Sequence, residues 1–87
     1  MCEARLERKV SRYLASVAKA FQRARVQPPK GMEEGVDEVI DAARRYFSDS
    51  IHFKNKRDLV TSLATVAYCE GLLDALRMLG FVEFEWE

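Results

Sequence analysis

Apolar residues recur at the spacing of one helix face in three segments of the chain. In the first, from residue 3 to about residue 24, they lie three or four positions apart, at Leu6, Val10, Tyr13, Leu14, Val17, Phe21 and Ala24. The same period restarts at Met32 and continues to about residue 52. A third segment, from about residue 58 to about residue 79, is apolar around most of its circumference. The pattern therefore predicts three helices.

Breaker residues separate the predicted helices. Pro28 and Pro29 remove two amide donors and keep the residue before them out of the helical conformation, so the first helix must end there. The next break is weaker, with Asn55 as a plausible cap, and Gly80 follows the third helix as a left-handed stop. Helices of about 20 residues are about 30 Å long, and short connections make neighbours antiparallel. We therefore expect an all-α, up-down-up three-helix bundle in a single domain, with an extended tail over residues 81–87.

The third predicted helix has a narrow charged stripe and a row of small residues. Glu70, Asp74 and Arg77 share one face, where a solvated ion pair between Asp74 and Arg77 explains them. The small residues are Ala64, Ala67, Gly71 and Ala75. Glycine in mid-helix costs about 1 kcal/mol relative to alanine unless packing needs the space, so we expect Gly71 at a close helix crossing.

The segment from Tyr68 to Phe81 resembles a known family. The residues that carry the resemblance are Tyr68, the run Gly71-Leu72-Leu73-Asp74-Ala75 and the ending Leu79-Gly80-Phe81. They resemble the most recognisable stretch of domain of unknown function 357, a family of small archaeal proteins, and residues 43–53 look like its second helix. Weaker, mainly apolar similarity covers most of the chain. The resemblance implies a small three-helix bundle and no established activity, cofactor or catalytic residue.

The size of the chain argues against an enzyme. It has 87 residues and a mass of 10.0 kDa, of which 48% are hydrophobic and 32% charged. A chain of this size hides only about 60 to 65% of its unfolded surface, so its core needs nearly every apolar residue. Little is left to enclose a ligand cavity of about 300 to 1,000 Å³. We expect no catalytic residue, no cofactor and no small-molecule substrate.

The residue types that hold metals or act as nucleophiles are few. His52 is the only histidine, and we interpret it as a surface or partly packed side chain. Cys2 and Cys69 lack Cys-x-x-Cys spacing, and the carboxylates show no zinc or calcium pattern, so we expect no metal. Cys69 lies about three turns into a helix parallel to the one that Cys2 precedes, an offset of about 15 Å. A disulfide spans at most about 7 Å, so we expect free thiols.

The aromatic residues and the tail leave alternatives open. Most of the aromatic residues fall on or near apolar faces, and we expect core packing for Tyr13, Phe21, Tyr46, Phe47 and Tyr68 rather than a base-stacking platform. The tail alternates apolar and acidic residues, which places Val82, Phe84 and Trp86 on one face of an extended segment. This face either folds back over its own bundle or docks on a second copy or another protein.

The formal net charge is zero, but the charges are segregated. Six bases of the first helix lie opposite its apolar face with no acid among them, namely Arg5, Arg8, Lys9, Arg12, Lys19 and Arg23. The up-down-up fold brings residues 1–13 beside residues 44–58, where nine bases and four acids give +5, leaving −5 elsewhere. The nine bases of this basic pole are Arg5, Arg8, Lys9, Arg12, Arg44, Arg45, Lys54, Lys56 and Arg57. A solvated face is one interpretation, and a phosphate binder or head-to-tail assembler is the other.

Two classes of function fit these observations best. The first is a non-enzymatic interaction module that works as a homo-oligomer or as a subunit of a larger assembly. The second is an accessory RNA binder whose basic pole contacts backbone phosphates, although a pI of 6.6 is low against the value of about 9 usual for such domains. A minor enzyme subunit is a third, weaker hypothesis. Charges throughout residues 1–12, and a longest charge-free stretch well below the roughly 20 residues of a membrane span, lead us to expect a cytoplasmic protein without membrane contact.

Overall fold

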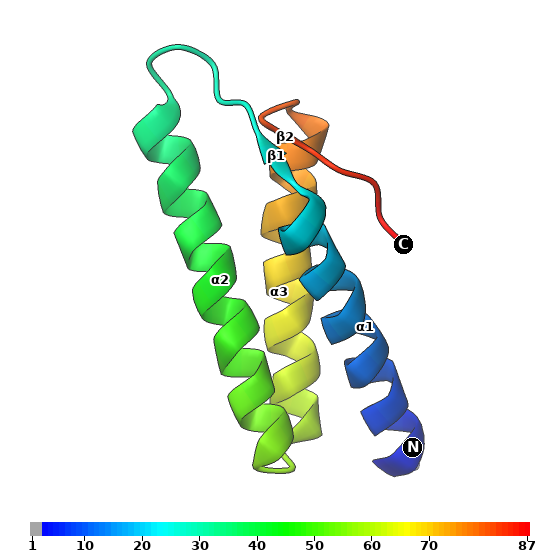
Figure 1. Ribbon diagram of the computed structural model, residues 1–87. Coiled ribbons are helices and arrows are strands. Elements are labelled where there is room, and N and C mark those ends of the chain that lie inside the picture. Colours follow the sequence, from blue (N-terminus) through cyan, green and yellow to red (C-terminus); the bar gives the residue numbers. More distant parts are fainter. Residues whose placement is uncertain (1–2) are drawn as a thin grey trace.

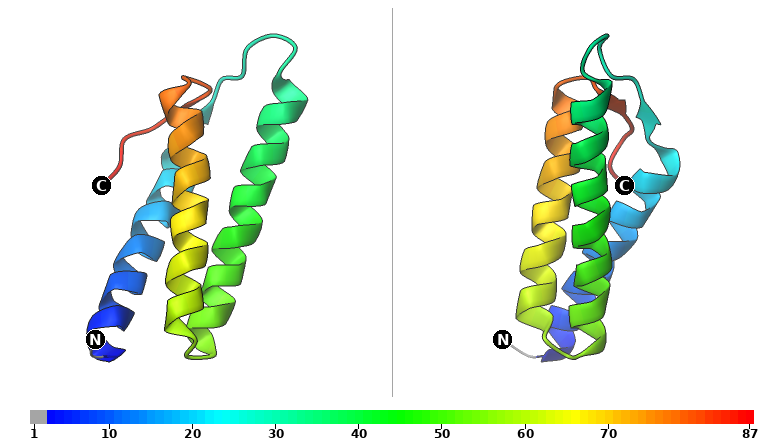
Figure 2. Two further views of the ribbon diagram at one scale, coloured as in Figure 1. Left: turned by 180° about the vertical axis from the view of Figure 1, so that it is seen from behind. Right: turned by 90° about the vertical axis from the view of Figure 1, so that its left-hand side faces the viewer.

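The computed structural model describes residues 3–87 as three long helices and two short strands (Figure 1). The elements follow one another as α1 (Glu3–Arg23), β1 (Arg25–Val26), α2 (Glu33–Asn55), α3 (Leu59–Met78) and β2 (Val82–Glu83). The helices run up, down and up, as predicted, and form a rod of 47 × 21 × 18 Å. α3 packs against both other helices, whereas α1 packs much less against α2 than against α3 (Figures 1 and 2).

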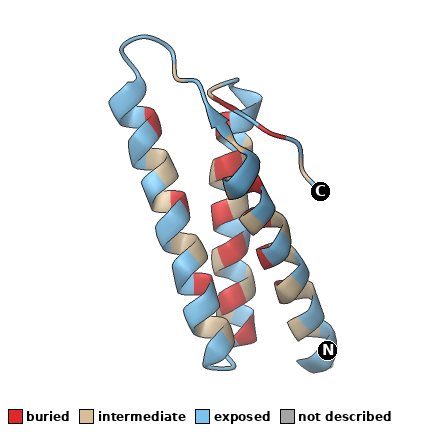
Figure 3. Cartoon of the chain, viewed as in Figure 1, coloured by how far each residue is buried: buried red, intermediate tan, exposed pale blue. Residues whose placement is uncertain are grey.

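The core lies where the apolar stripes of α1 and α2 meet the inner side of α3 (Figure 3). The buried apolar residues of the helices are Val10, Leu14, Val17, Ala20, Val36, Ala43, Leu59, Val66, Cys69, Leu73 and Leu76. Tyr13, Phe21, Tyr46 and Phe47 pack against this core, as expected, but Tyr68 does not. Its side chain is 57% exposed and lies against the ring of Tyr46, with 4.6 Å between ring centroids.

Two serines and a cysteine set the close contact between α2 and α3. The Ser62 hydroxyl donates to the Ser50 carbonyl oxygen at 2.7 Å, and the Ser50 hydroxyl donates to the Ser62 carbonyl oxygen at 2.8 Å. Two turns further, the Cys69 thiol donates to the carbonyl oxygen of Ala43 at 3.1 Å. Because each hydroxyl finds a partner, two fully buried serines fit in the core without an unpaired polar atom.

The expectation for Gly71 is wrong. Gly71 lies on the exposed side of α3, and a Cβ placed on it would meet no atom within 4 Å. The whole row of small residues, Ala64, Ala67, Gly71 and Ala75, faces outward. Because α3 is apolar on nearly every side, burial alone allows several rotations of this helix about its axis. The buried hydroxyls and thiol find their partners only in the rotation that turns Ser62 and Cys69 towards α2.

The ends of two helices differ from the sequence prediction, since α2 continues to Asn55 rather than ending at about residue 52 and α3 has a different cap. Asn55 is the last residue of α2 and not a cap, whereas the Asp58 carboxylate caps α3 by accepting from the Thr61 amide at 3.2 Å. Gly80 has a φ of +80° and ends α3 as predicted. The prediction about Cys2 concerns a residue outside the described range, and Cys69 is a free, buried thiol.

The C-terminal tail folds back onto its own bundle. α1 and α3 are parallel, so the chain leaves both at the same end, where β1 and β2 pair with Val26 opposite Val82. Val82 is 2% exposed and Phe84 is 8% exposed, while Glu83 and Glu85 point outward. Of the two alternatives for the tail, the structure shows the one in which its apolar face folds back over its own bundle.

This packing predicts that the tail stabilises the fold. Replacing Phe84 by alanine removes a buried aromatic ring and should lower the free energy of unfolding by about 3 kcal/mol or more, measured by urea denaturation. The exposed neighbour is the control, since Glu85→Ala should change stability by less than about 0.5 kcal/mol. Equal stability of the two variants would mean that the tail is not docked in solution.

Candidate functional site

The basic pole does not form one cluster. Arg5, Arg8, Lys9 and Arg12 line a shallow hollow of about 270 Å³ on the outer side of α1, and none of them forms an ion pair with another part of residues 3–87. Arg44 lies elsewhere, with its guanidinium carbon 4.8 Å from the centre of the Phe21 ring. Phe21 is nine residues beyond Arg12, which is about 13 Å along the helix. Arg45, Lys54 and Lys56 also stay outside the hollow.

Arg57 is occupied by acids of α1. Its guanidinium donates to Glu3 Oε1 at 2.7 Å and also to a carboxylate oxygen of Glu7. The hydrogen bond from Arg57, and then its charge, hold the pKa of Glu7 below the usual value. The acids likewise raise the pKa of Arg57. This residue therefore ties the start of α1 to the turn between α2 and α3 and is not a free contact for phosphate.

Arg57 also has an unfavourable backbone conformation, with a φ of +66°. Arg57→Gly should relieve about 1 kcal/mol of strain while losing the ion pair. Because the folded-state pKa of Glu7 is lowered, the pair contributes stability above the usual glutamate pKa and loses it as the pH falls through the lowered value. The variant should therefore exceed wild type in free energy of unfolding most clearly at a pH below the lowered pKa of Glu7, and by less at neutral pH.

Urea denaturation at both pH values measures this difference. Lys56→Gly is the matched control, because Lys56 has a φ of −85° and no strain to relieve. An Arg57→Gly variant with the same advantage over wild type at both pH values would contradict the role of the ion pair.

Asp74 anchors the tail. Its Oδ1 accepts from the indole nitrogen of Trp86 at 2.8 Å and from Arg77 Nε at 3.0 Å. The hydrogen bond from Trp86, followed by that from Arg77, holds the pKa of Asp74 below its usual value. The Asp74–Arg77 pair matches the sequence prediction, whereas the contact with Trp86 has no signal in helical spacing because it joins two elements.

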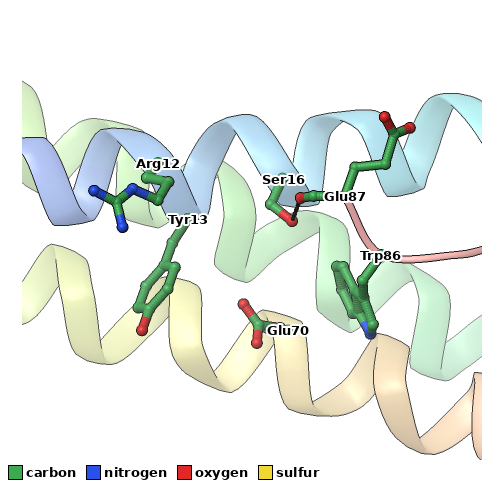
Figure 4. A pocket seen from close by; sticks show the side chains of 6 residues that line it. All are labelled: Arg12, Tyr13, Ser16, Glu70, Trp86 and Glu87. Carbon is green, nitrogen blue, oxygen red and sulfur yellow. Dashed lines mark hydrogen bonds between the residues drawn. The ribbon is translucent and has the colours of Figure 1, made fainter.

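A small hollow lies where the end of the tail meets α1 and α3 (Figure 4). Its volume is about 190 Å³, and its walls include the rings of Tyr13 and Trp86 with Arg12 and Glu70 beside them. The Ser16 hydroxyl donates to the Glu87 carbonyl oxygen at 3.0 Å and holds the end of the tail there. Val82, Phe84 and Trp86, the expected interface of the tail, are thus engaged within the chain.

The outer face of α3 is apolar along its whole length. Its large residues are well exposed, with Val60 at 71%, Met78 at 74% and Leu79 at 63%. The complete α3 outer face consists of Val60, Ala64, Ala67, Tyr68, Gly71, Ala75, Met78 and Leu79. The charged residues of the helix lie on its flank towards the tail. Next to Leu79, a wholly apolar hollow of about 250 Å³ opens between the end of α3 and the start of α2.

By length and composition alone, α3 would also suffice to cross a membrane. The central helix of a bundle meets the same criterion, and here the inner side of α3 is packed in the core.

His52 is exposed, and its ring centroid lies 5.5 Å from that of Phe53. No group of three or more metal-ligating side chains comes together within residues 3–87.

Fold and surfaces together define a small three-helix bundle closed by its own C-terminal tail. The model of the family DUF357, described as a protein of unknown function, matches residues 12–82, and the chain belongs to this family. No curated protein and no solved structure matches the chain.

Proposed function

We propose that this protein is a non-enzymatic interaction module that associates with copies of itself through the α3 outer face. The observation that carries the proposal is the exposure of seven uncharged, largely apolar residues along one side of a 20-residue helix, continued by Leu79 at its C-cap. Scattered apolar side chains are ordinary on a protein surface, but a continuous apolar face marks a contact surface.

The other described residues, 3–58 and 80–87, leave this face open. The tail docks on the flank of α3 that carries Asp74 and buries its apolar side there. Seen from behind, α3 lies in front of the other two helices, and neither of them crosses it (Figure 2). An occupant of this face therefore comes from outside residues 3–87, and we assign it to a second copy of the protein.

The dimensions of the face suggest a weak complex. A helix of 20 residues is about 30 Å long and presents a strip about 10 Å wide. Stable interfaces bury about 800 Å² on each partner, so a strip of this size belongs to the smaller class. We expect a dimer that dissociates in the micromolar range.

A charge placed on the face should abolish the association. Wild type should sediment as a dimer at high micromolar concentration and approach 10.0 kDa on dilution. Ala67→Glu buries an unpaired carboxylate in the contact and should be monomeric throughout, with unchanged helical circular dichroism. Ala15→Glu, an equal change at an exposed position of α1, should leave the dimer intact.

Two outcomes would contradict this proposal. Wild type at 10.0 kDa at every concentration would exclude self-association. Binding of monomeric wild type, but not of Ala67→Glu, to vesicles of neutral lipid would assign the same face to a membrane surface instead.

A second candidate function uses the hollow on α1. Four bases around one surface depression, free of acids, favour an accessory RNA binder that contacts backbone phosphates.

Three or four contacts should give a slope of about −2 to −3 in log affinity against log salt concentration. Arg8→Gln with Arg12→Gln should flatten this slope and weaken binding equally for unrelated RNA sequences. Lys30→Gln, at an exposed loop position, is the control, and absence of wild-type binding at about 50 mM salt excludes this function.

A further inference from the structure

We infer that the α3 outer face pairs with the same face of a second copy running in the opposite direction, around a two-fold axis near residue 69. This inference rests on the proposed self-association and adds the partner, its direction and the register. In this arrangement Ala67 of one copy lies opposite Gly71 of the other. Further from the axis, Ala64 lies opposite Ala75, and Val60 opposite Met78.

The order of side-chain sizes along the face fits this register. Small residues, Ala67 and Gly71, flank the axis, and the larger Val60 and Met78 lie at the two ends of the helix. Tyr68, the largest residue of the face, lies beside the axis and next to the open space over Gly71. A two-fold interface is built from one surface patch that is complementary to itself, so each position must match the position that mirrors it. Small residues at the centre allow two helices to approach to about 8 Å.

Tyr68 and Gly71 decide between the two possible directions. The space above Gly71 is open, because a Cβ there would meet nothing within 4 Å. With opposite directions, the exposed ring of Tyr68 lies beside Gly71 of the partner and fills this space. With the same direction, Tyr68 would meet its own copy at the centre of the contact and hold the two helices apart.

The charge distribution favours opposite directions as well. Apart from Arg44, which stacks on Phe21, residues 3–13 and 44–58 hold eight bases and four acids in one half of a rod 47 Å long, a charge of +4. The residues outside these two segments hold five bases and ten acids, a charge of −5. The acids of the other end include Glu33, Glu34, Asp37 and Glu38, all exposed on the first turns of α2. Exposed charges interact over about 10 Å at 0.1 M salt, so only pairing in opposite directions brings unlike ends within reach. Pairing in the same direction would place like charges together.

Spin labels at the ends of the face measure the direction. Labels are attached to Val60→Cys and Met78→Cys in a Cys2→Ser background, and Cys69 stays because its burial raises the pKa of its thiol to about 12 and keeps it unreactive. Positions 60 of the two copies should be separated by about 27 Å along the axis, since 18 residues at 1.5 Å each lie between them. A mixture of the two labelled proteins should show a short distance of about 10 Å between labels 60 and 78.

Salt provides an independent measurement on unmodified protein. If unlike ends are in contact, salt screens their attraction. The dissociation constant of the dimer should then rise several-fold between low and high sodium chloride concentration. Contact between like ends would give the opposite trend, since salt would screen repulsion.

The outcomes separate this inference from the proposed function. A sedimenting dimer with a short distance between labels at position 60 overturns the opposite direction and leaves self-association through α3 in place. A wild-type dimer that Ala67→Glu does not dissociate overturns both. If the label at position 60 itself weakens the dimer, as its sedimentation mass would show, the label at position 78 gives the same distance by symmetry.

Discussion

The fold depends on a helix that is apolar on more sides than the chain can cover. α1 and α2 bury the inner side of α3, and its sequence offers apolar residues on the outer side too. The hydrophobic effect alone would leave the rotation of such a helix undecided, because burial of any side would be favourable. Buried polar groups remove this freedom, since Ser50 and Ser62 satisfy each other only when one particular side of α3 faces α2. The direction of the α3 outer face follows from the same contact.

The tail completes the inner half of the molecule. It adds Val82 and Phe84 to the core, and a small bundle needs such additions because three helices of this length enclose little volume. Asp74 then fixes the last turn of the tail through Trp86, so an acid on the most apolar helix has a structural partner. As the tail occupies the flank beside Asp74, the outer face becomes the part of α3 that remains for contacts with other molecules.

Helical periodicity predicted the three helices and their directions, and the family resemblance agrees with the family that residues 12–82 match. Helical periodicity could not predict the rotation of α3. Gly71 was misleading, because a glycine in mid-helix indicated a close crossing inside the bundle. Glycine in mid-helix is consistent with close packing inside the chain and with close packing against another molecule, and a single sequence does not distinguish them. The links made by Arg57 and Trp86 also escaped prediction, because each joins side chains from different elements. A charge count placed Arg44 at the basic pole, but its stack on Phe21 depends on the tilt of α1.

The separation of charge in this molecule cannot be satisfied within one chain. Folding places most of the bases in one half of the rod and most of the acids in the other, and most of the bases form no ion pair within residues 3–87. The ion pairs that do form, such as those of Arg57 with Glu3 and Glu7, join residues of the same end. A second copy in the opposite direction offers each end a partner of the opposite sign and covers the α3 outer face at the same time. An apolar face that lies along the rod and a charge gradient that follows it therefore favour the same arrangement through two forces that respond oppositely to salt.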